Sequence, residues 1–272
     1  AREHAEALTG LPFEELKAQV ARTERELLVL LPKPLDRRGE RRRSPLLEAA
    51  YLARRLAEAG LKGLVFAGAR KSAELIARYA AHPLVRPYRA GYTARERRRL
   101  EADLKEGRVR VLVSTSALEL GVDIGELDAV VLVGYPGSTA AFWQRAGRAG
   151  RGERRALLVY IPREDPMDEY FLHRPALLLE SPPEEAVADP QNPVLCPLHL
   201  HAAAREKPLL AEELLCPEAR ATLKERNGRF FTPKRNPHRE ITLRGLGATF
   251  TLRGPDGEVL GYLDERQAYW EA

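Results

Sequence analysis

Cysteine, methionine and long apolar runs are all scarce in this sequence of 272 residues. Its two cysteines, Cys196 and Cys216, cannot build a disulfide framework, so the composition fits a reducing, cytoplasmic compartment. No apolar run approaches the ~20 residues that span a bilayer, and no signal-like segment opens the chain. These absences argue against a disulfide-stapled secreted domain, and we expect no membrane partner.

Lysine is scarce as well, since it supplies only eight of the 44 basic residues. The formal net charge of +5 favours anionic partners, although a charge of this size does not by itself indicate nucleic acid. The single methionine is Met167, and the chain opens with Ala-Arg-Glu-His. We therefore expect a fragment or a processed product of a longer chain.

Two phosphate- and metal-binding motifs are missing. The pattern G-x-x-x-x-G-K-[ST], whose backbone cradles nucleotide phosphates, occurs nowhere, and no D-E-x-H or D-E-x-D follows a predicted strand. The chain therefore lacks the parts with which many nucleotide hydrolases hold phosphate and Mg²⁺.

Short β-branched runs alternate with segments of helical spacing along the first 165 residues. This alternation predicts an α/β fold, with a parallel sheet covered by helices on both faces. Thr93 followed by Glu96 is a capping box for one of the helices. Strands are expected at 26–31, 63–67, 84–88, 109–113, 129–133 and 156–161, and helices at 46–59, 72–81, 93–105 and 139–149.

The pattern changes beyond residue 165. Proline-rich stretches at 175–197 break the periodicity, a helix is expected at 209–224 and an extended piece at 229–232, and strand alternation over 241–263 surrounds a Gly-Pro-Asp-Gly hairpin turn. The domains expected are 1–26 as a linker or the end of a preceding domain, 27–165 as the sheet domain, 166–236 as a winged-helix-like α+β region, and 237–272 as a β-rich segment.

The segment 144–151 reads Gln-Arg-Ala-Gly-Arg-Ala-Gly-Arg and is the most informative in the chain. On a helix, Gln144, Arg148 and Arg151 share one face. Glycine is costly inside a helix, so its presence between long basic side chains indicates a site for an anion rather than an ordinary solvated surface.

A second segment, 114–124, follows a predicted strand. Ser114 and Thr115 stand where hydroxyls can bond phosphate oxygens, Gly121 permits a tight turn, and Asp123 can accept from a ribose hydroxyl. Taken alone, the segment is more typical of a plain strand-turn-helix with capping residues than of a binding site.

Three segments in order resemble the second RecA-like domain of superfamily 2 helicases. Residues 64–74 resemble motif IV, residues 114–124 motif V and residues 144–151 motif VI. The stretches at 88–92, 118–125, 134–137 and 143–148 resemble more closely the subfamily that includes mitomycin repair factor A and its fungal RecQ4-like relatives. The resemblance implies a RecA-like fold for the sheet domain.

In that family ATP lies between two RecA-like domains, and the resemblance implies roles on that basis. Arg148 and Arg151 would be arginine fingers that stabilise charge on the transferring phosphoryl group. Gln144 would position the phosphates or the attacking water, and Gly121 and Asp123 would line the sugar side. Arg145 lies on another helical face, for which a structural or DNA-side role is expected.

The same resemblance implies contacts with the backbone of a nucleic acid. Such contacts carry little sequence information and weaken with salt. For Arg70 and Arg89 an ordinary exposed arginine is an equal alternative. The candidates are Ser114, Thr115, Gly68, Arg70, Arg89 and Gly91.

The resulting hypothesis is the C-terminal half of an ATP-dependent helicase acting on single-stranded or forked DNA. Polarity from 3′ to 5′ and a repair role come only from the resemblance. ATP and Mg²⁺ would be bound mainly by a first RecA-like domain that this chain lacks, so the isolated chain is expected to be inactive. The alternatives are a non-catalytic module that binds nucleic acid or a partner, and half of an RNA helicase.

A zinc site is a further alternative, raised by the cysteines and histidines near residue 200. The spacing of Cys196, His199, His201 and Cys216 does not match a common structural zinc motif. We expect no metal there, and instead a packed turn around Pro197.

Overall fold

The computed structural model describes residues 2–16, 25–36, 41–119, 122–150, 155–184, 189–241 and 249–264. Contacts between residues divide the chain into two compact units. We call them the sheet unit, whose described residues lie between 25 and 184 and at 250–263, and the small unit, whose described residues lie at 2–16 and 189–249, with residue 264.

The sheet unit is built on six parallel strands in the order β1-β6-β5-β2-β4-β3. Its central strands are apolar and buried on both faces, as expected of a parallel sheet between helical layers. The predicted fold class is confirmed. The strands are β1 (Arg25–Val29), β2 (Gly63–Phe66), β3 (Val85–Tyr88), β4 (Val111–Ser114), β5 (Ala129–Val133) and β6 (Ala156–Ile161).

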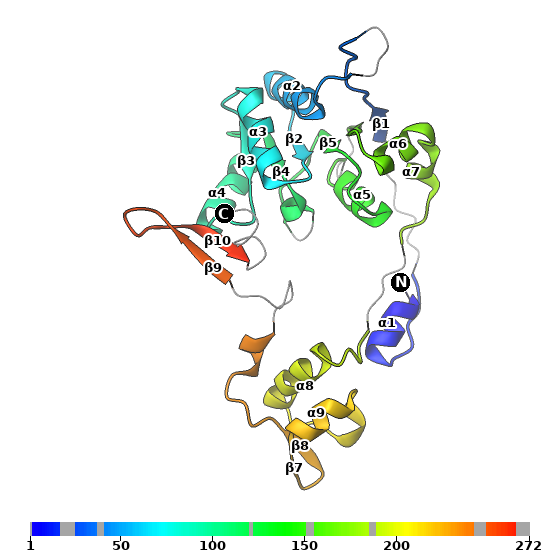
Figure 1. Ribbon diagram of the computed structural model, residues 1–272, viewed down its shortest axis with the longest axis vertical. Helices are drawn as coiled ribbons and strands as arrows, with labels where there is room; N and C mark the ends of the chain where they lie inside the picture. The colour runs from blue at the N-terminus through cyan, green and yellow to red at the C-terminus, as the bar shows by residue number, and fades with distance from the viewer. Residues whose placement is uncertain are drawn as a thin grey trace. The chain divides into compact units, whose positions relative to one another are not determined.

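Helices cover both faces of this sheet (Figure 1). One core contains buried residues of α2 and α3, and the other contains buried residues of α4, α5, α6 and α7. The predicted capping box of α4 is present, since Thr93 Oγ1 accepts from the Glu96 N–H and Glu96 Oε2 from the Thr93 N–H, at 3.3 and 3.0 Å. The helices are α2 (Pro45–Glu58), α3 (Arg70–Ala80), α4 (Ala94–Lys105), α5 (Thr139–Ala146), α6 (Pro166–His173) and α7 (Ala176–Glu180), with the 3₁₀ turn η1 (Ser116–Leu118).

Two differences from the sequence-based expectation bear on function. Helix α5 ends at Ala146 rather than residue 149, because Gly147 forms its C-cap and Gly150 has a φ of +70°. Phe171 and Leu178 pack into the sheet core, so α6 and α7 belong to the sheet unit although they lie beyond residue 165. The expected domain identities stay predictions.

The small unit has a core of its own, formed around α8 by buried residues that include both cysteines. The expected helix at 209–224 is wrong, because this stretch contains a 3₁₀ turn and a short helix that begins at Pro217. The expected turn at 195–200 is also wrong, because it is helical and Pro197 lies in the first turn, where a missing N–H costs nothing. The elements are α1 (Arg2–Thr9), α8 (Leu195–Glu206), η2 (Ala211–Glu213), α9 (Pro217–Thr222), β7 (Lys224–Arg226), β8 (Arg229–Phe231) and η3 (Pro237–Glu240).

A β-hairpin of β9 (Thr249–Arg253) and β10 (Val259–Asp264) follows. Its turn lies at the predicted Gly-Pro-Asp-Gly, where the Gly257 N–H donates to the Gly254 carbonyl at 3.0 Å and Gly257 has a φ of +79°. Part of the expected alternation, 242–248, lies outside the described residues.

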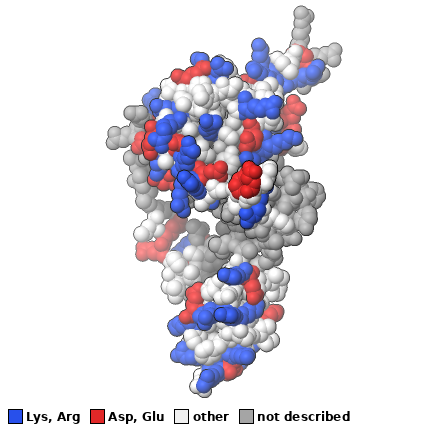
Figure 2. Space-filling model, turned by 90° about the vertical axis from the view of Figure 1, so that its left-hand side faces the viewer, with Lys and Arg blue, Asp and Glu red and all other residues white. Residues whose placement is uncertain are grey.

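Basic and acidic side chains are interspersed on the face of the chain shown in Figure 2. Several exposed arginines of the sheet unit are paired with carboxylates, for example Arg54 with Glu58 and Arg108 with Asp103. Charge sign therefore does not delimit a binding surface on this face. Among the described residues, no helix has the length and apolar character that crossing a membrane requires.

Candidate functional site

The carboxyl ends of the parallel strands form one edge of the sheet, which we call the carboxyl edge. Phe66 of β2, Ser114 of β4 and Tyr88 of β3 are paired in register as the last residues of three neighbouring strands. The residues that follow them, including Gly68 and Thr115, therefore lie along the same edge. Ligands of open α/β sheets bind outside this edge.

The candidate nucleic-acid contacts differ in how accessible they are. Gly68 is exposed, Arg70 and Thr115 are half-buried, and Ser114 is fully buried. The Ser114 hydroxyl is buried and has no hydrogen-bond partner among the described residues, so it is not exposed at the surface in this structure. Arg70 is the first residue of α3, directly after the β2 loop.

Arg89 has partners within the protein. Its Nε lies 3.0 Å from Glu74 Oε1, and its guanidinium carbon lies 4.7 Å from the centroid of the Tyr92 ring. Gly91 in the same loop is covered from β10, because a Cβ on Gly261 would lie 2.0 Å from the Gly91 carbonyl oxygen. The hairpin thus approaches the β3 loop closely enough to require glycine.

The motif V and motif VI segments are in direct contact. Arg145 Nε donates to Glu119 Oε2 at 2.8 Å, and both side chains are largely buried. The guanidinium carbon of Arg145 lies 5.3 Å from the centroid of the Phe66 ring, at the end of β2. Arg145 therefore has the structural role that was one of its two expected roles.

Arg148 is buried, with 6% of its surface exposed. Its Nε and Nη2 donate to the Glu119 carbonyl at 3.1 and 2.6 Å, and its Nη1 donates to the Val122 carbonyl at 2.7 Å. Because α5 ends at Ala146, Arg148 stands on the following turn and not on the helical face that the sequence suggested, which it would have shared with Gln144. The guanidinium therefore lies on the backbone of the motif V segment.

The remaining candidates of the nucleotide site are spread out. Gln144 is exposed on the last turn of α5. Asp123 is exposed, pairs with Lys105 Nζ at 2.7 Å and accepts from the Gly125 N–H at 3.1 Å. Gly121 and Arg151 lie outside the described residues. The predicted roles of all these residues stay predictions.

Sequence reasoning missed a polar centre after β6. Asp168 is fully buried and accepts from the Tyr135 N–H at 2.7 Å, from the Tyr160 hydroxyl, and from Arg163 Nε at 3.4 Å. Burial, followed by the hydrogen bond to Asp168, raises the pKa of Tyr160. A Cβ on Gly134, at φ +80°, would lie 2.1 Å from Arg163 Nε, so this contact requires glycine. Helix α6, which carries Asp168, could have been predicted from the sequence, because Asp165 directly before Pro166 is an N-cap signature.

A second missed residue is Glu184, whose carboxylate lies at the N-terminus of α5. It accepts from the N–H groups of Thr139 and Ala140 at 2.6 and 3.0 Å. These backbone hydrogen bonds lower the pKa of Glu184 to about 2. The local sequence holds no signal for this contact, because 45 residues separate Glu184 from Thr139.

In the small unit, the residues weighed for zinc serve the core. Both ring nitrogens of His201 pair with threonine hydroxyls, Nδ1 with Thr232 at 2.8 Å and Nε2 with Thr222 at 3.0 Å. Cys196 and Cys216 are buried in the core of this unit. In the part of the chain that the structure describes, no three metal-ligating side chains are grouped as a site.

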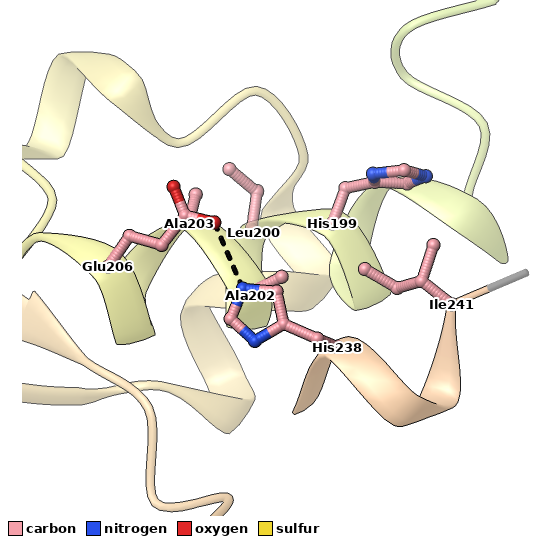
Figure 3. Close-up of a pocket in the computed structure, with 7 residues that line it drawn as sticks. All are labelled: His199, Leu200, Ala202, Ala203, Glu206, His238 and Ile241. Atoms are coloured by element: carbon pink, nitrogen blue, oxygen red, sulfur yellow. Dashed lines mark hydrogen bonds and ion pairs between the residues drawn. The ribbon is translucent and has the colours of Figure 1, made fainter. Parts of the chain in front are cut away.

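A cavity of about 550 Å³ lies between α8 and η3 in the small unit (Figure 3). His238 Nε2 pairs with Glu206 Oε1 at 2.9 Å on its wall, and the His199 ring points away from this pair. The two histidines are therefore not arranged around a common centre. The cavity is lined by His199, Leu200, Ala202, Ala203, Glu206, His238 and Ile241.

Comparison with known proteins adds independent evidence. Residues 47–153 match the family model of the helicase conserved C-terminal domain. The uncharacterized ATP-dependent helicase YprA of Bacillus subtilis is 36% identical over 221 residues, 78% of this chain and 30% of YprA. ATP-dependent helicase hrq1 of Schizosaccharomyces pombe is 37% identical over 179 residues, 62% of this chain and 17% of hrq1. The crystal structure of the DUF1998 helicase MrfA bound to DNA and AMPPNP matches with a TM-score of 0.79 at 30% identity, over 98% of this chain and 41% of MrfA.

The six-stranded parallel sheet, with the motif IV and motif V segments following β2 and β4 and the motif VI segment at the end of α5, defines the class of RecA-like α/β domains. The sheet unit contains the helicase conserved C-terminal domain over residues 47–153 and is a second RecA-like domain of the superfamily 2 helicases. The chain spans less than half the length of each of these three relatives.

Proposed function

We propose that this chain is the C-terminal motor half of an ATP-dependent DNA helicase. The observation that carries the proposal is the contact between motif VI and motif V, in which Arg148 lies on the backbone of the segment after β4. That contact places the Arg148 guanidinium against the main chain of the motif V segment. The names of the relatives, which are ATP-dependent helicases, and the DNA and AMPPNP bound to MrfA support the same assignment.

In this proposal ATP binds between the sheet unit and a first RecA-like domain. Arg148 and Arg151 stabilise the charge on the transferring phosphoryl group, and Gln144 positions the phosphates or the attacking water. Gly121 and Asp123 face the sugar. No cluster of metal-ligating side chains occurs among the described residues, so Mg²⁺ would be held by the first domain together with the phosphates.

The carboxyl edge would also contact the backbone of single-stranded or forked DNA. Gly68 and Thr115 offer polar groups where neighbouring strands end, and Arg70 and Arg89 add positive charge. Ser114 and Gly91 would take part only if the groups that now cover them moved. Movement from 3′ to 5′ and a role in DNA repair belong to the proposal, as does a winged-helix-like role for the small unit, in which α8 and α9 precede the hairpin β7–β8.

The test is the ATPase activity of the natural full-length protein with and without single-stranded DNA. We expect Arg148→Ala to lower kcat by about 10³-fold or more, the range typical of arginine fingers. Arg78→Ala is the matched control, because Arg78 is an exposed arginine in the last turn of α3 and lies outside the motif segments.

Because Arg148 is buried, Arg148→Lys and a thermal unfolding curve accompany the alanine variant. A folded Arg148→Ala protein with the kcat of the wild type would refute the proposal. The isolated chain is expected to show no ATP turnover, and turnover abolished by the same substitution would contradict that part.

The alternative is a nucleic-acid-binding module without hydrolysis, for which the candidate backbone contacts along the carboxyl edge would be sufficient. It predicts nucleic-acid binding by the full-length protein with no ATP turnover. Comparing DNA and RNA strands in the same assay separates the DNA helicase from the RNA helicase.

A further inference from the structure

Glu119 is the one described residue that bonds motif VI with both its side chain and its main chain. Its carboxylate accepts from Arg145 Nε, and its carbonyl accepts from Arg148 Nε and Nη2. It follows η1, directly before residues 120–121, and was not a candidate in the sequence.

The Glu119–Arg145 pair is shielded from water. The side chains are 14% and 12% exposed, and the Arg145 guanidinium stacks over Phe66. Water and salt screen such a pair much less than the exposed ion pairs of α2, whose members are 31–62% exposed. The pair therefore holds the carboxyl end of α5 against the motif V segment.

Helix α5 cannot orient Arg148 by itself, because the helix ends two residues earlier. The Arg148 N–H donates to the Arg145 carbonyl at 3.1 Å, and this turn ties its backbone to the anchored residue. The guanidinium is then held by the carbonyls of Glu119 and Val122. Glu119 takes part in both attachments, and Val122 adds one further carbonyl to the second.

We infer that Glu119 is a positioning residue for Arg148. Its carboxylate fixes Arg145 and hence the turn, while its carbonyl fixes the guanidinium, so motif V and the finger move as one body. Glu119 does not touch the nucleotide in this assignment. The inference rests on the proposed function, in which Arg148 acts on the nucleotide phosphates.

A double-mutant cycle in the full-length protein tests the inference. We expect Glu119→Gln to lower kcat about tenfold and to change the KM for ATP less than about twofold. A misplaced arginine finger reduces the stabilisation of the transition state more than it reduces the binding of ATP. In an Arg148→Lys background, Glu119→Gln should have no further effect on kcat, since residues that act as a unit are not additive.

Glu48→Gln is the matched control, because the Glu48 side chain is 12% exposed and pairs with Arg43. Glu48 lies on α2, which packs into a different core from α5. It should retain the kcat of the wild type. If Glu119→Gln fails to fold, Arg145→Lys tests the same ion pair from the arginine side, because lysine keeps the charge but loses the planar guanidinium. It should produce the same fall in kcat.

The outcomes separate the inference from the proposed function. A wild-type kcat for folded Glu119→Gln, or an undiminished tenfold fall in the Arg148→Lys background, would overturn the inference alone. If the wild type hydrolyses no ATP, or if Arg148→Ala has no effect, the proposed function fails first.

Discussion

Single side chains in this protein fix loops by bonding several groups at once. Asp168 joins the loop after β5, the hydroxyl of Tyr160 on β6 and the guanidinium of Arg163. A buried carboxylate needs such partners, because an unpaired charge in the interior is costly. Gly134 is required beside it for steric reasons. These residues shape the carboxyl edge without belonging to any of the helicase motifs.

His201 predicts a pH dependence at the same scale. Burial, with a smaller effect of Lys234, lowers its pKa below the usual 6.5. As the pH falls through 6.5, the unfolded chain takes up a proton that the folded chain resists. This contribution to stability is therefore complete above pH 6.5 and decreases below it. We expect the melting temperature of the small unit to fall between pH 7.5 and pH 5, as measured by circular dichroism.

His201→Gln is the control for that measurement. Glutamine keeps hydrogen-bonding groups but does not titrate, so the variant should be less stable and should lose this part of the pH dependence. An identical dependence of melting temperature on pH in both proteins would rule out His201 as its source.

At the scale of elements, α5 is held from outside at both ends. Backbone N–H groups at its amino end donate to the Ser138 hydroxyl and to the Glu184 carboxylate. At its carboxyl end, the Arg145 side chain donates to the Glu119 carboxylate. Free N–H groups of the first turn attract anions, and Glu184 fills that place here. The motif VI helix thus has an orientation set by its own N-cap and by two other segments of the chain.

The amino-end contact gives a second prediction. Backbone hydrogen bonds lower the pKa of Glu184 to about 2, from a usual value of 4.5. Its stabilisation is therefore complete above pH 4.5 and is lost as the pH falls through about 2. We expect Glu184→Gln to lower the melting temperature of the sheet unit at pH 7, and this difference from the wild type should vanish toward pH 2.

Glu180→Gln is the matched control, since Glu180 is an exposed glutamate at the end of α7. It should leave the melting temperature unchanged. Equal losses in the two variants, or a loss in Glu184→Gln that persists at pH 2, would contradict the assignment of Glu184 as a cap.

How well elements were predicted depends on whether their signals are local. β5 and β6 match the prediction residue for residue, because each is an unbroken apolar run that follows a charged residue and ends at a glycine or a proline. The capping box of α4 lies within four residues and was also predicted. Helix α8 was missed because Pro197 suggested a turn, and the end of α5 was missed because arginine spacing continues beyond the point where glycine stops the helix.

At the scale of the whole molecule, the two units have separate cores. Chains with separate cores need not unfold in one step. We expect two transitions in differential scanning calorimetry of the chain. Gly134→Ala should lower the temperature of the sheet-unit transition only. It should reduce the free energy of unfolding of that unit by about 1–3 kcal/mol, because alanine is strained at the left-handed backbone conformation of this residue, beside Arg163.

His201→Gln provides the reciprocal change, because it should lower only the small-unit transition. A single transition that both substitutions shift together would show that the units unfold as one body.

The sequence by itself determined the parallel α/β fold, the order of the helicase motifs and the α4 cap. Periodicity, capping and motif spacing depend on residues close together in the chain. Only the tertiary structure decided that Arg148 lies on the carbonyls of motif V, that Glu184 caps α5 and that Glu119 joins the two motifs. The residues in these contacts are 26 to 45 positions apart, and packing of the sheet and its helices brings them within hydrogen-bond distance.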